Sequence, residues 1–210
     1  MSASVAILDY GMGNLGSVAN MVRHVGGEAK LCSQPGQVNG YSKIILPGVG
    51  HFAMAMQRLR NDGWSEVLEQ ARANGAWIFG ICLGMQLMTL GSEEGDDDGL
   101  GWFQLQTKRF PRETAGGRRV LVPHMGWNHA LAVDARFTAW AAVDSPGRFY
   151  FVHSFYVDGA EDSTCWAATE YGGVRFASGI QLGRLWGTQF HPEKSHRCGM
   201  ALMGHFLKQN

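Results

Sequence analysis

The stretch Gly80-Ile81-Cys82-Leu83-Gly84-Met85-Gln86 decides the expected fold of this chain and the position of its chemistry. The apolar run at 76–79 before it is typical of a buried strand, and the apolar residues at 83–88 indicate the start of a helix. A strand and a helix joined by a sharp turn that carries one reactive side chain form a nucleophile elbow. Glycine suits the positions two before and two after the cysteine, because a tight turn leaves no room for Cβ atoms there.

Cys82 is the candidate nucleophile of this elbow. A thiol at the start of a helix lies at the positive end of the helix dipole, which favours the reactive thiolate. Most free cysteines are nevertheless small buried apolar residues. The interpretation of Cys82 as reactive therefore depends on partner residues elsewhere in the chain.

Length and overall charge limit the kind of protein this is. A chain of 210 residues with 45% hydrophobic residues is long enough for a substantial core, and we expect a single domain over 1–210. Because the formal net charge is +0, the overall charge gives no general attraction to nucleic acid or to an anionic membrane surface.

The cysteines and the start of the chain indicate a cellular compartment. No basic segment followed by an apolar run opens the chain, so a secretory signal is not expected. The longest apolar stretch, around 77–85, is shorter than the ~20 residues that a membrane-spanning helix needs. The four cysteines lack CxxC spacing, and we therefore expect reduced thiols in a cytoplasmic protein.

The first part of the chain alternates between buried strands and amphipathic helices. This order favours a mostly parallel sheet covered on both faces by helices, with the functional site at the carboxyl edge of its strands. The expected strands cover 5–8, 28–32, 43–46 and 76–79, and the expected helices lie around 18–25, 52–59 and 64–71.

The segment Gly11-Met12-Gly13-Asn14-Leu15-Gly16 matches the G-x-G-x-x-G pattern of dinucleotide-binding loops. In such a site the next strand ends in an acid that holds the ribose. Here it ends in Cys32-Ser33-Gln34. We therefore reject a dinucleotide site and expect a tight turn with an exposed Asn14.

The pattern changes after Gly91. The acidic segment 92–99 is typical of a solvated loop, and we expect it to be dispensable for the chemistry. Short strand-like runs punctuated by glycine or proline follow, and they predict antiparallel pairing. The expected strands cover 103–107, 120–122, 149–152, 166–171, 174–178 and 185–189, and a closing helix is expected over 200–207.

A cysteine nucleophile needs a base and a group that orients the base. Of the eight histidines, His191 stands out because it follows an apolar strand that Pro192 prevents from continuing. Glu193 has the same sidedness in an extended segment, so its carboxylate can bond the far imidazole nitrogen. No metal is expected, because His191, His196 and His205 lack ligand spacing.

These residues together resemble class I glutamine amidotransferases, and the resemblance covers essentially the whole chain. Within that family the sequence is similar to HisH-type glutaminase subunits of imidazole glycerol phosphate synthase. The resemblance implies a flavodoxin-like α/β fold with a mostly parallel central sheet, helices on both faces and a smaller antiparallel sheet. It rests on six blocks in the family's order, at 9–14, 46–50, 82–86, 122–128, 151–154 and 191–195.

The resemblance implies a mechanism without a cofactor. Cys82 attacks the side-chain amide of glutamine and gives a thioester and ammonia, while His191 moves protons and Glu193 orients His191. Backbone N–H groups stabilise the oxyanion. The oxyanion residues carried over are Leu83 in the elbow and Val49 and Gly50 in the loop 47–50, and the substrate-binding residues are Gln86, His153, Ser154 and Phe155.

The resemblance also implies a partner. In the family, ammonia passes to a HisF-type cyclase, a (β/α)8 barrel bound as a heterodimer, which makes imidazole glycerol phosphate and AICAR in histidine biosynthesis. The glycine loop rejected above as a dinucleotide site becomes part of this docking face. The residues carried over to it are Met12, Asn14, Trp127, Tyr150 and Lys194.

Other functions remain open at this point. Gly101-Trp102 and the segments 187–189 and 195–197 are more similar to paralogues that supply ammonia for amidino sugars of surface polysaccharides. A stand-alone cysteine γ-glutamyl hydrolase and a catalytically silent regulatory subunit are further alternatives. Glu193 and the docking residues favour a glutaminase subunit over the former, and the intact triad argues against the latter.

Overall fold

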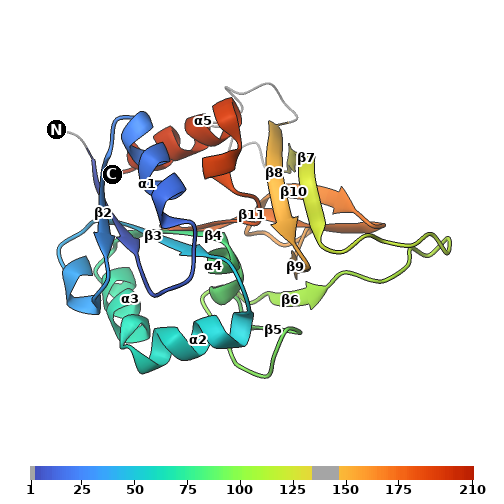
Figure 1. The fold of residues 1–210 in the computed structure, drawn as a ribbon, viewed down its shortest axis with the longest axis horizontal. Coiled ribbons are helices and arrows are strands. Elements are labelled where there is room, and N and C mark those ends of the chain that lie inside the picture. The colour runs from blue at the N-terminus through green and yellow to red at the C-terminus, as the bar shows by residue number, and fades with distance from the viewer. Residues whose placement is uncertain (1–2, 134–146) are drawn as a thin grey trace.

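A central sheet runs through the molecule in the computed structural model, which describes residues 3–133 and 147–210 (Figure 1). Its strands follow the order β2-β1-β3-β4-β12-β11-β10-β7-β8. The first five of these are parallel neighbours. The alternation of strands and helices predicts this for four of them, whereas the last, the run expected over 185–189, is predicted to pair antiparallel and does so only on its other side. The five strands are β2 (Glu28–Cys32), β1 (Ser4–Leu8), β3 (Lys43–Gly48), β4 (Trp77–Cys82) and β12 (Leu185–Thr188).

Helices cover both faces of this parallel part (Figure 1). On one face lie α1 (Leu15–His24) and α5 (His196–Leu207), and on the other lie α2 (Phe52–Asn61) and α3 (Trp64–Ala73). Strand side chains alternate between the two cores: Ile7 packs with the α1 and α5 side, and Leu8 with the α2 and α3 side. The period-2 pattern of the buried strands therefore builds two separate apolar layers.

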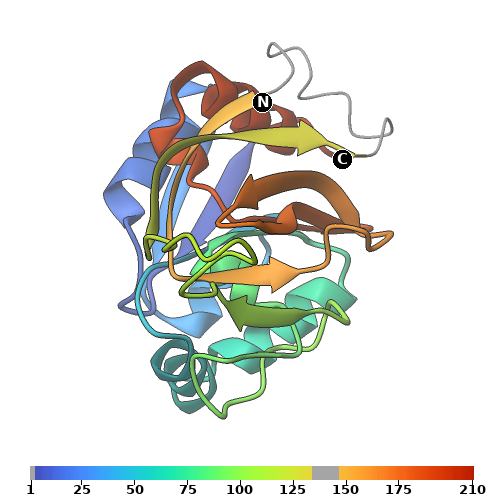
Figure 2. The same cartoon turned by 90° about the vertical axis from the view of Figure 1, so that its right-hand side faces the viewer.

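The sheet changes direction at β12, which pairs antiparallel with β11 (Val174–Leu182). Beyond it follow β10 (Cys165–Tyr171), β7 (His124–Ala132) and β8 (Gly147–His153). A side branch of β9 (Phe155–Asp158), β6 (Gln106–Arg109) and β5 (Gly91–Ser92) joins β11, and Figure 2 shows β9 and β6 side by side. The expected α/β fold is confirmed, with the antiparallel strands hydrogen-bonded to the parallel ones.

Two expected strands are wrong in their bounds. The run 120–122 is not a strand, and β7 begins only at His124, after Pro123, whose nitrogen has no hydrogen to donate to a ladder. The run 103–107 forms a strand only from Gln106 onward. The sequence patterns also missed β5 and β9, whose two and four residues are too short to show a clear periodicity.

We expect Phe79→Ala to lower the free energy of unfolding by about 3–5 kcal/mol. Phe79 is fully buried on β4, with its ring centroid 5.1 Å from that of Phe206 on α5 and 6.2 Å from that of Trp186. Truncation leaves a cavity between sheet and helix, which urea denaturation followed by circular dichroism measures. Leu31→Ala, on the exposed side of β2, is the control and should cost about 0.5 kcal/mol or less. Equal losses in the two variants would contradict this core.

Candidate active site

The elbow holds Cys82 in a backbone conformation that side chains rarely adopt. Cys82 has φ 54° and ψ −108° between β4 and the short helix α4 (Leu83–Leu87), and such strain costs about 1–3 kcal/mol. A Cβ atom on Gly80 would lie 2.7 Å from the Gly84 backbone, and one on Gly84 would lie 1.9 Å from the Leu46 carbonyl oxygen. Both glycines are therefore required by close packing. Because α4 has five residues, its dipole is small.

His191 and Glu193 form a buried pair at the end of β12. This strand lies beside β4, with Thr188 opposite Ile81, so the chain leaving β12 passes next to Cys82. His191 Nδ1 is 2.8 Å from Glu193 Oε1, and the side chains are 2% and 1% exposed. The sequence analysis predicted that His191 and Glu193 would lie in an extended segment, and this prediction is wrong. Residues Pro192–Lys194 form a 3-10 turn, because Pro192 starts it and the Lys194 N–H donates to the His191 carbonyl.

The electrostatics of His191 favour a protonated imidazole. Burial by itself would lower the pKa of His191, but the negative charges of Cys82 and Glu193 outweigh burial and raise it. His191 Nε2 is buried and has no partner at hydrogen-bonding geometry within the described chain, which leaves that nitrogen free to exchange a proton. An imidazolium here would stabilise a thiolate at Cys82.

A cavity of about 340 Å³ opens above the elbow. All the candidates for oxyanion stabilisation and for substrate binding line it together with the nucleophile. The sequence analysis missed Glu94, Pro123 and Val152. The lining residues are Val49, Gly50, Cys82, Leu83, Gln86, Glu94, Pro123, Val152, His153, Ser154 and Phe155.

Glu94 corrects the interpretation of the acidic segment as simply a solvated loop, while its dispensability stays a prediction. Glu94 lines the cavity, and its Oε2 accepts a hydrogen bond of 2.8 Å from the Phe52 N–H at the start of α2. Glu93 accepts another of 2.8 Å from the Arg109 N–H. The segment is therefore anchored to the fold. No local pattern could have revealed this, because Phe52 and Glu94 lie 42 positions apart.

The end of β3, at Pro47 and Gly48, and the loop that follows it pack directly on the elbow. A Cβ atom on Gly48 would lie 2.8 Å from the Gly84 nitrogen, and Gly50 has φ 113°, a value that favours glycine. The Tyr10 hydroxyl donates a hydrogen bond of 2.8 Å to the Pro47 carbonyl. Burial, followed by the charge of Cys82, raises the pKa of Tyr10, so this hydroxyl keeps its proton. The loop is held at one end and carries an exposed Val49 at the other.

The glycine loop before α1 touches the loop after β3. A Cβ atom on Gly13 would lie 3.3 Å from Pro47, and one on Gly50 would lie 2.9 Å from Met12 Cε. Met12 and Gly13 are thus neighbours of the oxyanion candidates. The G-x-G-x-x-G match here serves this packing.

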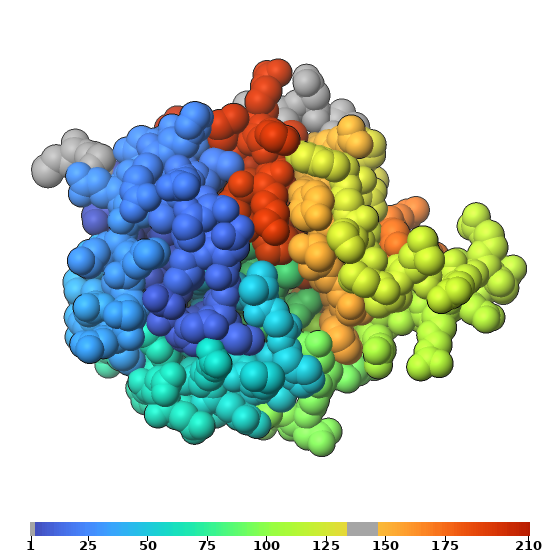
Figure 3. Space-filling model, viewed as in Figure 1, coloured from blue at the N-terminus to red at the C-terminus, as the bar shows by residue number. Residues whose placement is uncertain are grey.

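Three of the candidate docking residues form one cluster. Trp127 on β7 lies opposite Tyr150 on β8, with ring centroids 6.1 Å apart, and Lys194 Nζ lies 5.6 Å from the Tyr150 ring centroid. Two residues that sequence analysis did not assign there join the cluster. His196 stacks on Trp127 at 5.3 Å, and the Arg148 guanidinium lies 5.6 Å from the Trp127 ring centroid. Figure 3 shows α1, the 191–196 segment, β8 and β7 side by side on one face.

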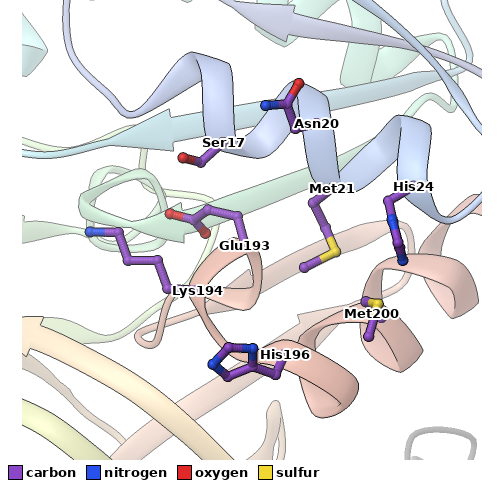
Figure 4. Close-up of a pocket in the computed structure, with 8 residues that line it drawn as sticks. All are labelled: Ser17, Asn20, Met21, His24, Glu193, Lys194, His196 and Met200. Atoms are coloured by element: carbon purple, nitrogen blue, oxygen red, sulfur yellow. The ribbon is translucent and has the colours of Figure 1, made fainter.

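A second hollow, of about 430 Å³, lies on the far side of Glu193 between α1 and α5 (Figure 4). Figure 4 shows the Glu193 carboxylate turned toward Ser17 on α1, while Lys194 extends away from Met21. Glu193 Oε2 is buried and makes no hydrogen bond within the described chain. One oxygen of the Glu193 carboxylate is therefore bonded to His191, and the other lies without a hydrogen-bond partner in the described chain at the edge of this hollow.

Metal and membrane features are absent from residues 3–133 and 147–210. No group of three or more His, Cys, Asp or Glu side chains there is placed to hold a metal ion. None of the helices in these ranges is long and apolar enough to cross a bilayer. The cysteines Cys32, Cys82, Cys165 and Cys198 are all free thiols.

Comparison with known proteins decides the family. The family model described as glutamine amidotransferase class-I matches residues 6–209. The chain belongs to the class-I glutamine amidotransferase family. The family resemblance inferred from the six sequence blocks is therefore confirmed, and the elbow, the imidazole–carboxylate pair and the cavity are features of an amidotransferase fold.

Relatives of this amidotransferase match it along nearly the whole chain. The imidazole glycerol phosphate synthase subunit HisH 2 of Pseudomonas aeruginosa is 38% identical over 205 residues, which cover 97% of this chain and 98% of the relative. The subunit HisH of Acinetobacter baylyi is 40% identical over 207 residues, which cover 98% of each. The expected similarity to HisH-type subunits is thus confirmed.

Solved structures of other amidotransferases share the fold. PurLQS from Thermotoga maritima superposes with a TM-score of 0.76 at 16% identity, covering 99% of this chain and 98% of that chain. The glutaminase domain of Trypanosoma brucei CTPS gives a TM-score of 0.66 at 17% identity, covering 100% and 95%. At these identities the similarity shows the fold alone.

We expect Glu193→Gln to slow alkylation of Cys82 by iodoacetamide at pH 7 roughly tenfold. A neutral amide would no longer stabilise the charged imidazole, so His191 would hold less positive charge beside the sulfur. Peptide mass spectrometry measures the rate, with the partly exposed Cys198 as internal reference. An unchanged Cys82 rate would contradict an action of this carboxylate on the sulfur through His191.

Proposed function

We propose that this chain is the glutaminase subunit of imidazole glycerol phosphate synthase. In this proposal it hydrolyses glutamine to glutamate and ammonia and passes the ammonia to a HisF-type cyclase in histidine biosynthesis. The observation that carries the proposal is the strained Cys82, which lines a cavity and interacts with the buried His191–Glu193 pair. The full-length HisH relatives support the same assignment. Reduced thiol chemistry of this kind suits the cytoplasm.

The first half of the reaction forms a thioester. The Cys82 thiolate attacks the amide carbon of glutamine, and the resulting oxyanion receives hydrogen bonds from backbone N–H groups of Leu83 and of Val49 or Gly50. The His191 imidazolium donates its Nε2 proton to the leaving nitrogen. The carbon–nitrogen bond then breaks, ammonia leaves, and a γ-glutamyl thioester remains on Cys82.

The second half regenerates the enzyme. His191, now neutral, takes a proton from a water molecule that attacks the thioester carbonyl carbon. The same N–H groups stabilise the second oxyanion. Its collapse releases glutamate and the Cys82 thiolate, and His191 is again protonated, so glutamine and water have become glutamate and ammonia. Glu193 holds the His191 Nδ1 proton throughout and keeps Nε2 directed at the reacting atoms.

The α-ammonium and α-carboxylate groups of glutamine are assigned to cavity residues away from Cys82. We assign the α-ammonium group to Glu94, which lines the cavity and is an anionic partner for it. The α-carboxylate falls to the segment of His153, Ser154 and Phe155. Gln86 lines the cavity at 4% exposure, but both of its amide N–H groups are donated to protein atoms. We therefore assign to Gln86 the shaping of the wall.

Docking of the partner has a direct physical route to catalysis. Met12 lies close to Gly50, and Gly13 lies close to Pro47. A displacement of the glycine loop by a partner would therefore also displace the loop that carries Val49. A partner changes that loop only by binding its active arrangement more tightly than its resting one. Asn14 and the Trp127, Tyr150 and Lys194 cluster supply the remaining contacts of the proposed docking face.

One observation favours the alternative acceptor, an amidino sugar of a surface polysaccharide. The segment 195–197 departs toward that group of paralogues, and His196 within it stacks on Trp127 at an interplanar angle of 6°. The segment in which this chain resembles the polysaccharide paralogues therefore lies in the proposed docking face. Purification of the complex, with identification of the partner and its product, separates the two acceptors. Full glutamine turnover without any partner would instead favour a stand-alone hydrolase.

Cys82→Ala is expected to reduce glutamine-dependent synthesis by at least about 10⁴-fold, because the thioester can no longer form. Synthesis by the complex with free ammonium salt should persist, since the partner performs that chemistry. Both rates are measured on purified complex. Cys198→Ala, at a partly exposed thiol away from the cavity, is the control and should retain both activities. Near-normal glutaminase activity in Cys82→Ala would refute the nucleophile.

The isolated chain is expected to hydrolyse glutamine slowly, because loss of one oxyanion donor costs about 10²–10³ in rate. Lys194→Ala should change this basal rate little and lower stimulation by the liganded partner about tenfold. The measurement is glutaminase rate at saturating partner, with and without the ligand of the cyclase. Lys30→Ala, an exposed lysine on β2, is the matched control. Full stimulation of Lys194→Ala would show that this cation does not couple the subunits.

A further inference from the structure

A buried chain of side-chain hydrogen bonds ends at the sulfur of Cys82. The Gln189 amide nitrogen Nε2 lies 3.7 Å from Cys82 Sγ, and Gln189 is fully buried. On its other side, Gln189 Oε1 accepts a hydrogen bond of 3.0 Å from Gln86 Nε2. Because the oxygen of Gln189 faces a donor, its nitrogen faces the sulfur. The sulfur thus receives an N–H group rather than a lone pair.

The orientation of Gln86 is fixed in turn by a backbone carbonyl. Gln86 Nε2 also donates to the Phe155 carbonyl oxygen at 3.0 Å, so both of its amide hydrogens are used inside the protein. His153 Nδ1 lies 2.7 Å from the same oxygen. A carbonyl oxygen only accepts hydrogen bonds, so His153 must carry its proton on Nδ1.

Two neutral histidines continue the chain. Burial lowers the pKa of His153 to about 3, so its Nε2 is an unprotonated acceptor. His124 Nδ1, 3.0 Å away, must therefore be the donor. Burial also lowers the pKa of His124, to about 4, and its Nε2 accepts a hydrogen bond of 3.2 Å from Asn128 Nδ2.

The orientation of the Asn128 side-chain amide is fixed at the far end of this series of hydrogen bonds. Its Oδ1 accepts a hydrogen bond of 2.8 Å from the His129 N–H, and its Nδ2 donates to the Glu170 carbonyl at 3.1 Å. These two contacts allow one amide orientation only. The series from Asn128 through His124 and His153 therefore has a defined donor at each link and ends at the Phe155 carbonyl oxygen, where Gln86 donates independently.

The direction of the last link matters for the chemistry of the sulfur. The Val152 carbonyl oxygen lies 3.9 Å from Cys82 Sγ and can accept from a thiol but cannot stabilise a thiolate, and the His191 imidazole interacts with the sulfur from the side of β12. A donor such as the Gln189 amide stabilises the anion. The titratable side chains that act on this sulfur or line its cavity are Tyr10, His191, His153 and Glu94.

We propose that Gln189 is a further catalytic residue, which donates a hydrogen bond to the Cys82 sulfur and stabilises its thiolate, and that Gln86 is the positioning residue that keeps the Gln189 amide in this orientation. The inference rests on the glutaminase function proposed above. Gln189 acts when the thiolate attacks the amide and again when it leaves the thioester, because the sulfur is anionic in both states.

The test follows alkylation of Cys82 by iodoacetamide across pH 5–10, on the folded chain without glutamine or partner. A charge-assisted hydrogen bond is lost in Gln189→Leu, so its alkylation at pH 7 should fall roughly tenfold or more and its profile should move to higher pH. Gln189→Glu keeps the packing and places a carboxylate oxygen at the sulfur, so its shift should be larger. Glutaminase kcat should fall in both variants in the same order.

Two further variants separate this role from a general loss of structure. Thr188→Val alters the neighbouring buried residue, whose hydroxyl donates to the Phe190 carbonyl and does not touch the sulfur, and its profile should match the parent. Gln86→Leu removes the donor that faces the Gln189 oxygen. It should shift the profile in the same direction as Gln189→Leu but less.

The outcomes are distinguishable. A parental alkylation profile in both Gln189 variants overturns the proposal, whether or not the protein is a glutaminase. An equal shift in Thr188→Val also overturns it, because the effect would then follow from packing. If the parent complex has no glutaminase activity but the Gln189 variants shift as expected, the proposed function fails while the hydrogen bond to the sulfur stands.

Discussion

The close approach of Gly84 to Leu46 is the constraint on which the rest of the site depends. No side chain fits between α4 and β3, and the turn that allows this contact forces Cys82 to a positive φ. The end of β3 is then pressed against the elbow through Gly48. On the other side of β4, the parallel neighbour β12 delivers His191. One backbone contact thus sets the proposed nucleophile between its proposed base and the candidate oxyanion donors.

Besides the backbone strain at Cys82, the site carries the free-energy cost of burying a charged pair. His191 and Glu193 are almost fully buried, and Glu193 leaves one carboxylate oxygen without a hydrogen bond inside the described chain. Buried charges of this kind contribute little to stability, because desolvation offsets their attraction. Their arrangement is explained by chemistry: together they raise the pKa of His191 and direct its free nitrogen toward the sulfur. Strain and unpaired polarity meet where the reaction takes place.

Surface residues of the proposed docking face are in direct contact with residues that line the cavity. The glycine loop, whose pattern is that of a nucleotide-binding turn, instead packs on Pro47 and places Met12 against Gly50. The aromatic and cationic cluster around Trp127 lies on the strand that also carries Asn128, whose amide is hydrogen-bonded to His124 next to the cavity residue His153. The glycine loop belongs to the proposed docking face, so a bound partner is able to reach the oxyanion candidates through Met12.

The sequence by itself determined four parallel strands of the sheet and the helices that cover them, and it proposed Cys82, His191 and Glu193 as the candidate triad. These depend on periodicity and on motifs, which are local along the chain. Only the tertiary structure decided that Glu94 enters the cavity, that His196 stacks on Trp127, and that Gln189 faces the sulfur. Such contacts join residues far apart, as with Gln86 and Gln189 at a separation of 103 positions. No local pattern encodes them, because they exist only once the strands have paired.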